Sequence, residues 1–405
     1  MYIEIVLAKQ SFYKSWIEPF FKSPLRELSL TLFFISASYP PLRALMTSLF
    51  THEFGTEQTI PAMALSAIVL LPVIYFLGLS QKRFGVTTTY LGVSFLSILL
   101  ILGIYALHSL GFRSFTYTFF ILKNIYMIVF LTIIRGRINV SFSTNFLKQY
   151  YGPMGALAGI GTFFGGGIMK YLDEKGIVAL GIVFILMAAF TFYLSKKTSY
   201  AGKSKHLITS LKPISSYVVG IVLVVFLSQF FLFFVEYRWT KLIEMNFPIK
   251  IERTQYLGKC FKFIGLIETF LQLFITPLLF KFVKTEFIHF ALFLLFTSLA
   301  FLTNTTSSLF LASCSYILYK STDYSIFAVA KEFFYRPFTP DQKYGIKYFA
   351  DLLGYRLGKV ASSLLLLTLT SYLVALDVFI LIGSLSWAYA LYFLFFSKKK
   401  LRYDT

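Results

Sequence analysis

The feature that most constrains this chain is a series of about twelve apolar runs, each close to the ~20 residues that an α-helix needs to cross a membrane. Hydrophobic residues make up 57% of the 405 positions, so little sequence remains for a soluble domain. We therefore predict an all-α membrane protein. The approximate spans are 29–50, 60–80, 87–110, 114–135, 152–172, 177–195, 214–235, 261–283, 286–303, 307–328, 346–374 and 376–397.

Lysine and arginine are distributed unevenly between the predicted loops of this chain, whose formal net charge is +20. Basic residues crowd into alternate connections, whereas the 51–59 loop carries Glu53 and Glu57 with no lysine or arginine. Because cytoplasmic loops retain basic residues, this pattern predicts both termini in the cytoplasm. It also explains the charge without a nucleic-acid partner. One connection, 236–262, is assigned to the outside yet contains several basic residues balanced by acids.

A long hydrophilic stretch divides the predicted spans into two groups of six. In both groups a short basic turn follows the second span, and a longer polar stretch follows the fourth. This arrangement predicts a major-facilitator-type bundle of about 12 transmembrane helices in two six-helix halves, with the substrate between them. The expected parts are an amphipathic cytoplasmic segment (1–28), an N-terminal half (29–195), a basic cytoplasmic linker (196–213), a C-terminal half (214–397) and a basic cytoplasmic tail (398–405).

Charged residues within or beside the apolar spans are the candidates for a substrate pathway, since each ionised side chain at bilayer depth costs roughly 2.5–3.5 kcal/mol. An excess of cations over anions there favours an anionic substrate, because arginine and lysine bind phosphate and carboxylate groups. The basic candidates are Arg43, Lys123, Lys320, Lys331, Arg356 and Lys359, and the acidic ones are Glu236, Glu268, Asp323 and Asp351.

Two alternatives stay open for these charges. Lys320 and Asp323 lie one helical turn apart and could neutralise each other. Asp351 could be the structural partner of Arg356.

Prolines in the first span and glycines in the fifth span predict departures from a regular, straight helix packed at ordinary distances. Pro40 and Pro41 remove backbone donors and are expected to kink the first span beside Arg43. The fifth span, 152–172, contains seven glycines, which indicates either close helix packing or a bendable gating helix.

No catalytic pattern occurs in the chain. The four histidines are scattered, and Cys260 and Cys314 lack the spacing of a metal site. We expect no enzymatic activity, no cofactor and no metal.

Two segments resemble the ATP/ADP translocase (nucleotide transporter) family. The sequence DYSIFAVAKEFFYRPFTPDQKYGIKYFADLLGYRLGK, which ends at Lys359, is similar to the tenth and eleventh spans of that family. The sequence FVEYRWTKLIEMNFP, Phe234–Pro248, is similar to a motif that follows its seventh span. Weaker similarity covers 27–85 and 148–161.

The resemblance implies twelve helices of major-facilitator type and counter-exchange of nucleotides by alternating access. It implies substrate-handling roles for Glu236 and Lys331, and Arg43 matches a basic residue of the first span. The chain departs from the family at Met46, where the family has lysine, and at Lys123, where a glutamate is typical. From charge and resemblance together, the predicted substrate-binding residues are Arg43, Lys123, Glu236, Lys331, Arg356 and Lys359.

We therefore expect a secondary transporter that moves a nucleotide or related phosphorylated anion, with ATP and ADP as the first choice. The expected setting is the lipid bilayer of a bacterial inner membrane, with the protein as a monomer. One alternative is a transporter-derived protein that no longer transports and acts as a scaffold or receptor. Another is a major-facilitator transporter of a different organic anion.

Overall fold

The computed structural model describes residues 23–142, 144–195, 216–335, 338, 340–369 and 373–401, and these residues form helices joined by short turns. The predicted linker, 196–213, lies outside the described residues, as does most of the predicted N-terminal segment. Within the described residues no strand occurs, so the all-α prediction is confirmed.

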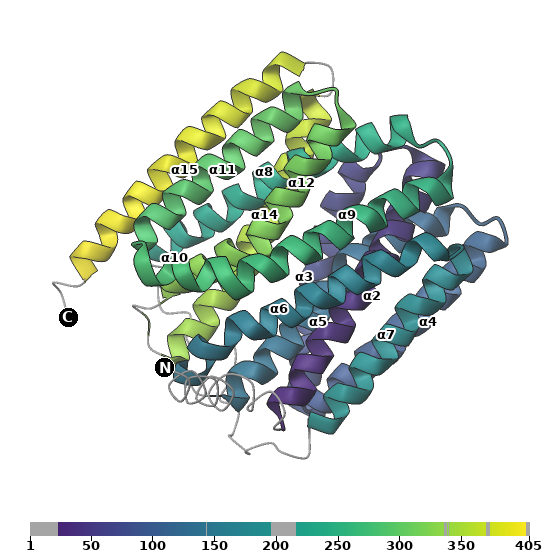
Figure 1. The fold of residues 1–405 in the computed structure, drawn as a ribbon, viewed down its shortest axis with the longest axis horizontal. Helices are drawn as coiled ribbons and strands as arrows, with labels where there is room; N and C mark the ends of the chain where they lie inside the picture. The colour runs from purple at the N-terminus through teal and green to yellow at the C-terminus, as the bar shows by residue number, and fades with distance from the viewer. Residues whose placement is uncertain are drawn as a thin grey trace, which may run out of the picture.

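Six helices precede the linker and run side by side (Figure 1). They are α2 (Leu25–Phe54), α3 (Thr59–Phe84), α4 (Val86–Ser109), α5 (Ser114–Ser141), α6 (Thr144–Ile168) and α7 (Glu174–Leu194).

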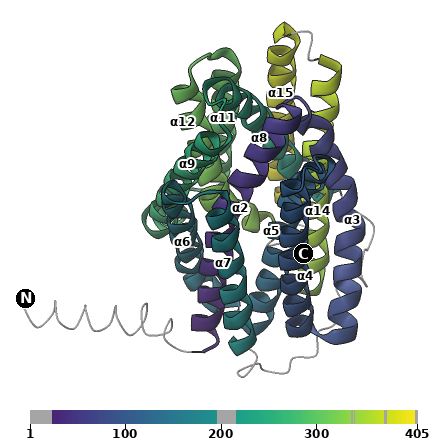
Figure 2. The same ribbon diagram turned by 90° about the vertical axis from the view of Figure 1, so that its right-hand side faces the viewer.

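The helices after the linker include several that are continued by π- or 3₁₀-helical turns. They are α8 (Ser216–Asn246), α9 (Lys250–Phe270), α10 (Thr276–Phe282), α11 (Thr285–Thr305), α12 (Leu309–Thr322), α13 (Ala328–Ala330), α14 (Pro340–Leu369) and α15 (Leu373–Leu401). The π-helical segment η5 (Leu271–Ile275) joins α9 to α10. A second π-helical segment, η6 (Asp323–Phe327), follows α12, and the 3₁₀ segment η7 (Lys331–Tyr335) follows α13. The start of α2 and the end of α15 lie at the same end of the bundle (Figure 1). Figure 2 shows α3 and α14 on one side of the bundle and α6 and α9 on the other.

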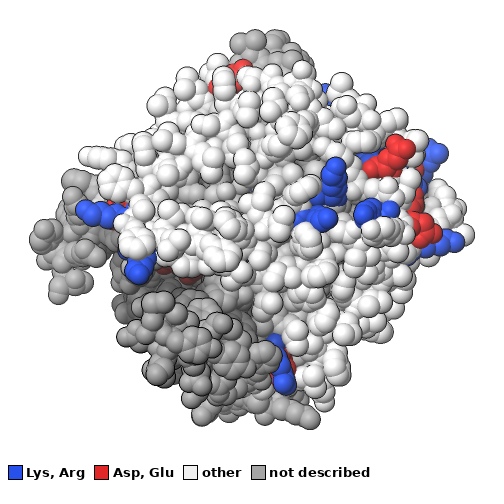
Figure 3. Space-filling model, viewed as in Figure 1, with Lys and Arg blue, Asp and Glu red and all other residues white. Residues whose placement is uncertain are grey.

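Eight helices of the described residues are long and apolar enough to cross a membrane. Their segments are Thr59–Phe84, Val86–Ser109, Ser114–Ile138, Glu174–Leu194, Ser216–Asn246, Lys250–Phe282, Thr285–Thr305 and Asp377–Phe395. Large apolar side chains stay exposed on them, Phe76 and Phe95 among many. Figure 3 shows broad areas of the surface without a charged side chain, with charges gathered mainly at the right-hand edge. These features are those of a multi-pass membrane protein.

The prediction of a long connection at 236–262 is wrong. In the structure α8 continues to Asn246 and α9 begins at Lys250, so only three residues separate the helices. The charged residues of this region therefore lie on the ends of two long helices. The apolar runs alone underestimated the lengths of both helices, because helix ends that reach past the hydrocarbon core carry polar side chains.

Helices from the two parts of the chain pack closely together. α6 packs along α9, α3 packs along α14, and α2 contacts α9. On α6, a Cβ atom at Gly165 would lie 2.1 Å from the backbone oxygen of Ala37 on α2. The glycines of α6 thus allow close backbone approach, as the packing interpretation predicted. α2 itself remains one helix through Pro40 and Pro41.

Candidate functional site

The centre of the bundle contains an ion pair that joins α2 to α8. Arg43 donates a hydrogen bond from Nη2 to Oε1 of Glu236, and the two residues are only 7% and 8% exposed. The same Nη2 lies 3.4 Å from the hydroxyl of Tyr316. The guanidinium carbon lies 5.1 Å from the ring centroid of Tyr39 and 5.6 Å from that of Phe261. Arg43 is therefore surrounded by a carboxylate and by aromatic faces, which stabilise a buried cation.

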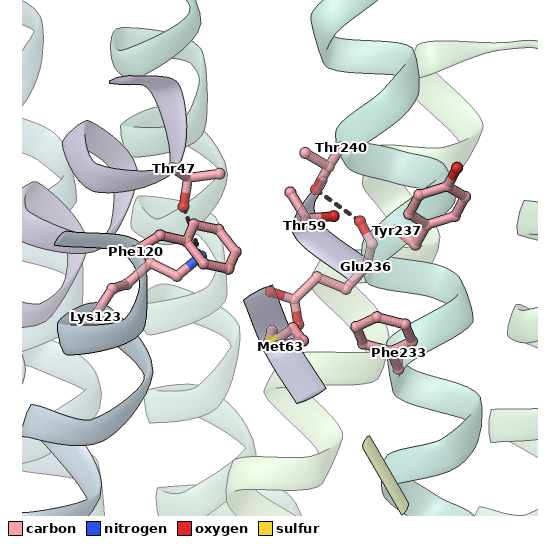
Figure 4. A pocket seen from close by; sticks show the side chains of 9 residues that line it. All are labelled: Thr47, Thr59, Met63, Phe120, Lys123, Phe233, Glu236, Tyr237 and Thr240. Atoms are coloured by element: carbon pink, nitrogen blue, oxygen red, sulfur yellow. Dashed lines mark hydrogen bonds between the residues drawn. The ribbon is translucent and has the colours of Figure 1, made fainter. Parts of the chain in front are cut away.

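A small cavity lies beside this ion pair, with Lys123 on one side and Glu236 on the other (Figure 4). Nζ of Lys123, on α5, donates a hydrogen bond of 3.0 Å to Oγ1 of Thr47 and lies 3.6 Å from the ring centroid of Phe120. The cavity volume is about 20 Å³, which suffices for about one water molecule. Its lining residues are Thr47, Thr59, Met63, Phe120, Lys123, Phe233, Glu236, Tyr237 and Thr240.

The carboxylate of Glu236 retains binding capacity after it has paired with Arg43. Its second oxygen, Oε2, is buried and has no hydrogen-bond partner. Besides Arg43, the cations Lys123, Lys320 and Lys359 interact electrostatically with this carboxylate. One acid is thus shared among several cations, so the cluster has a net positive charge that an anion would neutralise.

Three further predicted cations lie on the remaining walls of the bundle. Nζ of Lys331 donates to the hydroxyl of Tyr355 at 3.3 Å and lies 4.7 Å from its ring centroid. Nη2 of Arg356, on α14, donates to the backbone oxygen of Asn124 on α5 at 3.4 Å. Lys359, also on α14, is half-buried, and its Nζ forms no hydrogen bond with the described residues. The positive charge is therefore spread over elements from both parts of the chain.

The structure brings Arg43, Lys123, Glu236 and Lys359 within electrostatic reach of one another. Arg356 joins this group because it interacts with Lys359. Lys331 is linked to this group less directly: it donates to Tyr355 on α14, and it interacts with Asp323, which also interacts with Lys359.

Lys320 and Asp323, which could neutralise each other, interact electrostatically but form no ion pair of 4 Å or less in the structure. Nζ of Lys320 donates instead to the hydroxyl of Tyr324 at 3.2 Å, and Oδ1 of Asp323 has no hydrogen-bond partner. The backbone explains the difference: Asp323 begins a π-helical segment, which changes the direction of side chains relative to an α-helix. The side chain of Asp351, the suggested partner of Arg356, lies outside the part that the structure describes.

Sequence reasoning missed two neighbours of the ion pair, Thr47 and Tyr316. Both belong to spans in which threonine and tyrosine are common, so nothing in the local sequence separates them from other polar side chains. Their roles depend on which helices face each other. Met46, where the resembling family has lysine, is fully buried in the apolar core.

Comparisons with known proteins identify the family and the fold of this chain. The sequence matches the protein-family model described as TLC ATP/ADP transporter over residues 177–396, which is more than half of the chain. No curated protein matches the sequence.

Solved structures of membrane transporters share the fold at low sequence identity. The human organic anion transporter MFSD10 has a TM-score of 0.63 and 14% identity, with 92% of this chain and 100% of that chain covered. The nucleoside transporter NupG has a TM-score of 0.61 and 10% identity, with 91% and 98% covered. The Major Facilitator Superfamily transporter FucP has a TM-score of 0.56 and 12% identity, with 94% and 99% covered. With its helical bundle and its family match, the chain belongs to the TLC ATP/ADP transporter family and is a membrane transporter rather than an enzyme.

Proposed function

We propose that this protein is a secondary transporter that moves a nucleotide or a related phosphorylated anion by alternating access. The observation that carries the proposal is the set of buried cations that interact with Glu236, with Asp323 or with one another. Arg43, Lys123, Lys331 and Arg356 are each at most 7% exposed. Buried cations are expensive without a counter-anion, so a site that holds several of them is suited to a ligand with multiple negative charges.

The chemistry of the group fits a phosphate-bearing ligand with a planar ring. Arginine can bind phosphate with two parallel hydrogen bonds, while lysine supplies a mobile point charge. Next to Arg43, the ring of Tyr316 stacks on Trp239 at a centroid distance of 3.8 Å. These aromatic faces could contact a nucleobase, and the unpartnered Oε2 of Glu236 could accept a hydrogen bond from a sugar hydroxyl.

The structure corresponds to a closed state in this proposal, because the volume of the central cavity, about 20 Å³, is far too small for a nucleotide. At one end of the bundle, polar contacts join the α2–α3 region to the α8–α9 region. Nη1 of Arg253 donates to Oγ1 of Thr51 at 2.5 Å, and Nζ of Lys241 lies 3.3 Å from Oε1 of Glu57. For a nucleotide to enter from this end, these contacts must break and the helices must separate.

The finer topology is part of the same proposal. We infer about twelve transmembrane helices in two six-helix halves, 29–195 and 214–397, joined by the linker 196–213. Both termini face the cytoplasm of a bacterial inner membrane, and the protein acts as a monomer. The alternating distribution of basic loops and the shared end of α2 and α15 support this arrangement.

Uptake into proteoliposomes tests the proposed function. Purified protein should take up radiolabelled ATP or ADP, or another phosphorylated anion from a panel, when the vesicles contain unlabelled substrate. Lys331→Ala and Glu236→Ala should abolish uptake, whereas Lys175→Ala, which removes an exposed cation, should leave it unchanged. Absence of uptake for the whole panel, with and without a proton gradient, would contradict the proposal.

A second candidate function is favoured by one observation. The family model matches 177–396 and leaves most of the N-terminal half unmatched. A transporter-derived scaffold or receptor that no longer transports would show such divergence in one half. Its melting temperature should then be insensitive to nucleotides and sugar phosphates, and a ligand-dependent increase would exclude it.

A further inference from the structure

Two buried acids are not among the residues assigned to the proposed anion site. Glu268, on α9, is 7% exposed, and Asp323, at the start of η6, is 3% exposed. Neither forms an ion pair of 4 Å or less with another described residue, and Oδ1 of Asp323 has no hydrogen-bond partner. An ionised carboxylate without a cation in direct contact is expensive in such a place, so these acids need a proton or another cation.

Both acids adjoin the two π-helical segments, which contact each other inside the bundle. Gln272, in η5, links them: its Nε2 lies 3.3 Å from Oε1 of Glu268 and 3.2 Å from the backbone oxygen of Tyr324 in η6. π-Helical turns are rare and occur frequently at functional sites. The contact between η5 and η6 places Glu268 and Asp323 close enough to interact electrostatically.

A buried amide faces the same place from a third helix. Gln229, on α8, is 2% exposed and is directed at the carboxylate of Asp323, yet its Nε2 forms no hydrogen bond of good geometry. An unsatisfied donor beside an unsatisfied acceptor indicates a site that rearranges when its occupancy changes.

The two acids differ in the number of cations that face them. Lys320, Lys331 and Lys359 interact electrostatically with Asp323, as does the phenol of Tyr319. Arg135, on α5, interacts with Glu268. Asp323 thus faces the cations of the proposed anion site, whereas Glu268, on α9, faces Arg135.

We propose that Glu268 and Asp323 form a proton-binding site that couples proton movement to movement of the anionic substrate. This inference rests on the proposed transport function. The step is a simple protonation: a proton from water forms an O–H bond with a carboxylate oxygen, and the charge of that group changes from −1 to zero. Release of the proton restores the carboxylate, and no other reactant is needed.

The coupling follows from electrostatics. While Asp323 is ionised, it offsets part of the positive charge of Lys320, Lys331 and Lys359. Once Asp323 is protonated, that charge is available to an incoming anion, so the proton and the anion strengthen each other's binding. The expected mode is therefore symport of the anion with protons. Two carboxyl groups and two amides are suited to bind a single positive charge. They are too few ligands for a multivalent metal ion.

Infrared difference spectroscopy tests proton binding without any substrate. Protein in lipid nanodiscs should show a carboxylic-acid C=O band that changes between alkaline and acidic buffer. Asp323→Asn and Glu268→Gln should each lose part of this band, whereas Glu252→Gln, which removes an exposed carboxyl on α9, should not. If either amide variant fails to fold, Gln272→Leu serves instead, since loss of its bond to Oε1 should shift the band of Glu268 to higher frequency. Identical bands in wild type and variants would overturn the inference.

Transport supplies the second readout. An inward proton gradient should stimulate anion uptake into proteoliposomes, and this stimulation should be lost in Asp323→Asn and Glu268→Gln but kept in Glu252→Gln. Stimulation by a sodium gradient at constant pH, with none by the proton gradient, would overturn the inference. If wild type transports no nucleotide or phosphorylated anion, the proposed function fails, while the infrared bands still decide whether the two acids bind protons.

Discussion

The ion pair between Arg43 and Glu236 gives the sharpest prediction about stability. It is the direct charged contact between α2 and α8 at the centre of the bundle, and both side chains are at most 10% exposed. We consider the single variants Arg43→Met and Glu236→Leu together with the double variant. Glu236→Leu leaves Arg43 buried beside the rings of Tyr39 and Phe261 without its carboxylate, and Arg43→Met leaves the buried Glu236 without its direct ion-pair partner.

The magnitude follows from this burial. Removing one partner of a buried ion pair destabilises a protein by about 3–5 kcal/mol, because the remaining charge is left unpaired. Removing both partners eliminates that unpaired charge, so the double variant should be more stable than either single variant. If the pair exists only in the closed state, a loss of about 3 kcal/mol would also shift the closed-to-open ratio by roughly two powers of ten.

Unfolding in mixed micelles of dodecyl sulfate, followed by tryptophan fluorescence, measures these differences. Trp239 is a suitable reporter because its ring stacks on Tyr316, which contacts Arg43. The control is the exposed contact between Lys241 and Glu57, whose side chains are 38% and 72% exposed.

Loss of this exposed pair should cost only about 0–1 kcal/mol. A coupling energy at Arg43 and Glu236 no larger than that of the control would refute the reasoning, and so would a double variant less stable than both single variants.

Three further outcomes are expected. Lys123→Met should weaken binding of a phosphorylated ligand in titration calorimetry by about tenfold or more, while Lys123→Arg, which keeps the charge, should weaken it less. Gly165→Ala should lower the melting temperature, because its Cβ would lie 2.1 Å from the backbone oxygen of Ala37. Gly167→Ala is the control and should have little effect, because the nearest atom to its Cβ is 3.7 Å away. Arg253→Met should increase labelling of cysteines introduced at the α8–α9 end of the bundle, since it removes a contact that joins α2 to α9, and unchanged labelling would show that this contact does not close that end.

Several parts of the fold could be predicted because they depend on local sequence. Apolar runs of sufficient length must form helices in lipid, where backbone groups can be satisfied only within the segment. The glycines of α6 likewise indicated close packing before any neighbour was known. The connection at 236–262 was predicted wrongly, because hydropathy detects the part of a helix in the hydrocarbon core and misses polar ends.

The candidate site was predictable in its charges but not in its contacts. Arg43, Lys123 and Glu236 stood out because ionised side chains are rare within apolar spans. Their partners, Thr47 and Tyr316, did not, since their residue types are common throughout the chain. The α-helical spacing of Lys320 and Asp323 left open whether they neutralise each other; they interact electrostatically, but they form no direct ion pair where the backbone changes to a π-helix at Asp323.

The sequence by itself determined that this chain is a helical membrane protein with an excess of positive charge within its spans. Apolar runs insert into lipid because their transfer is favourable, and charged side chains within them stand out because their transfer is costly. Only the tertiary structure decided that Glu236 pairs with Arg43, 193 positions away in the chain, and that Glu268 and Asp323 approach each other across two π-helical segments. These pairings depend on which helix faces meet, and many faces of similar polarity compete. Packing between the backbones of α2, α6 and α9 selects among them, because only complementary surfaces approach so closely.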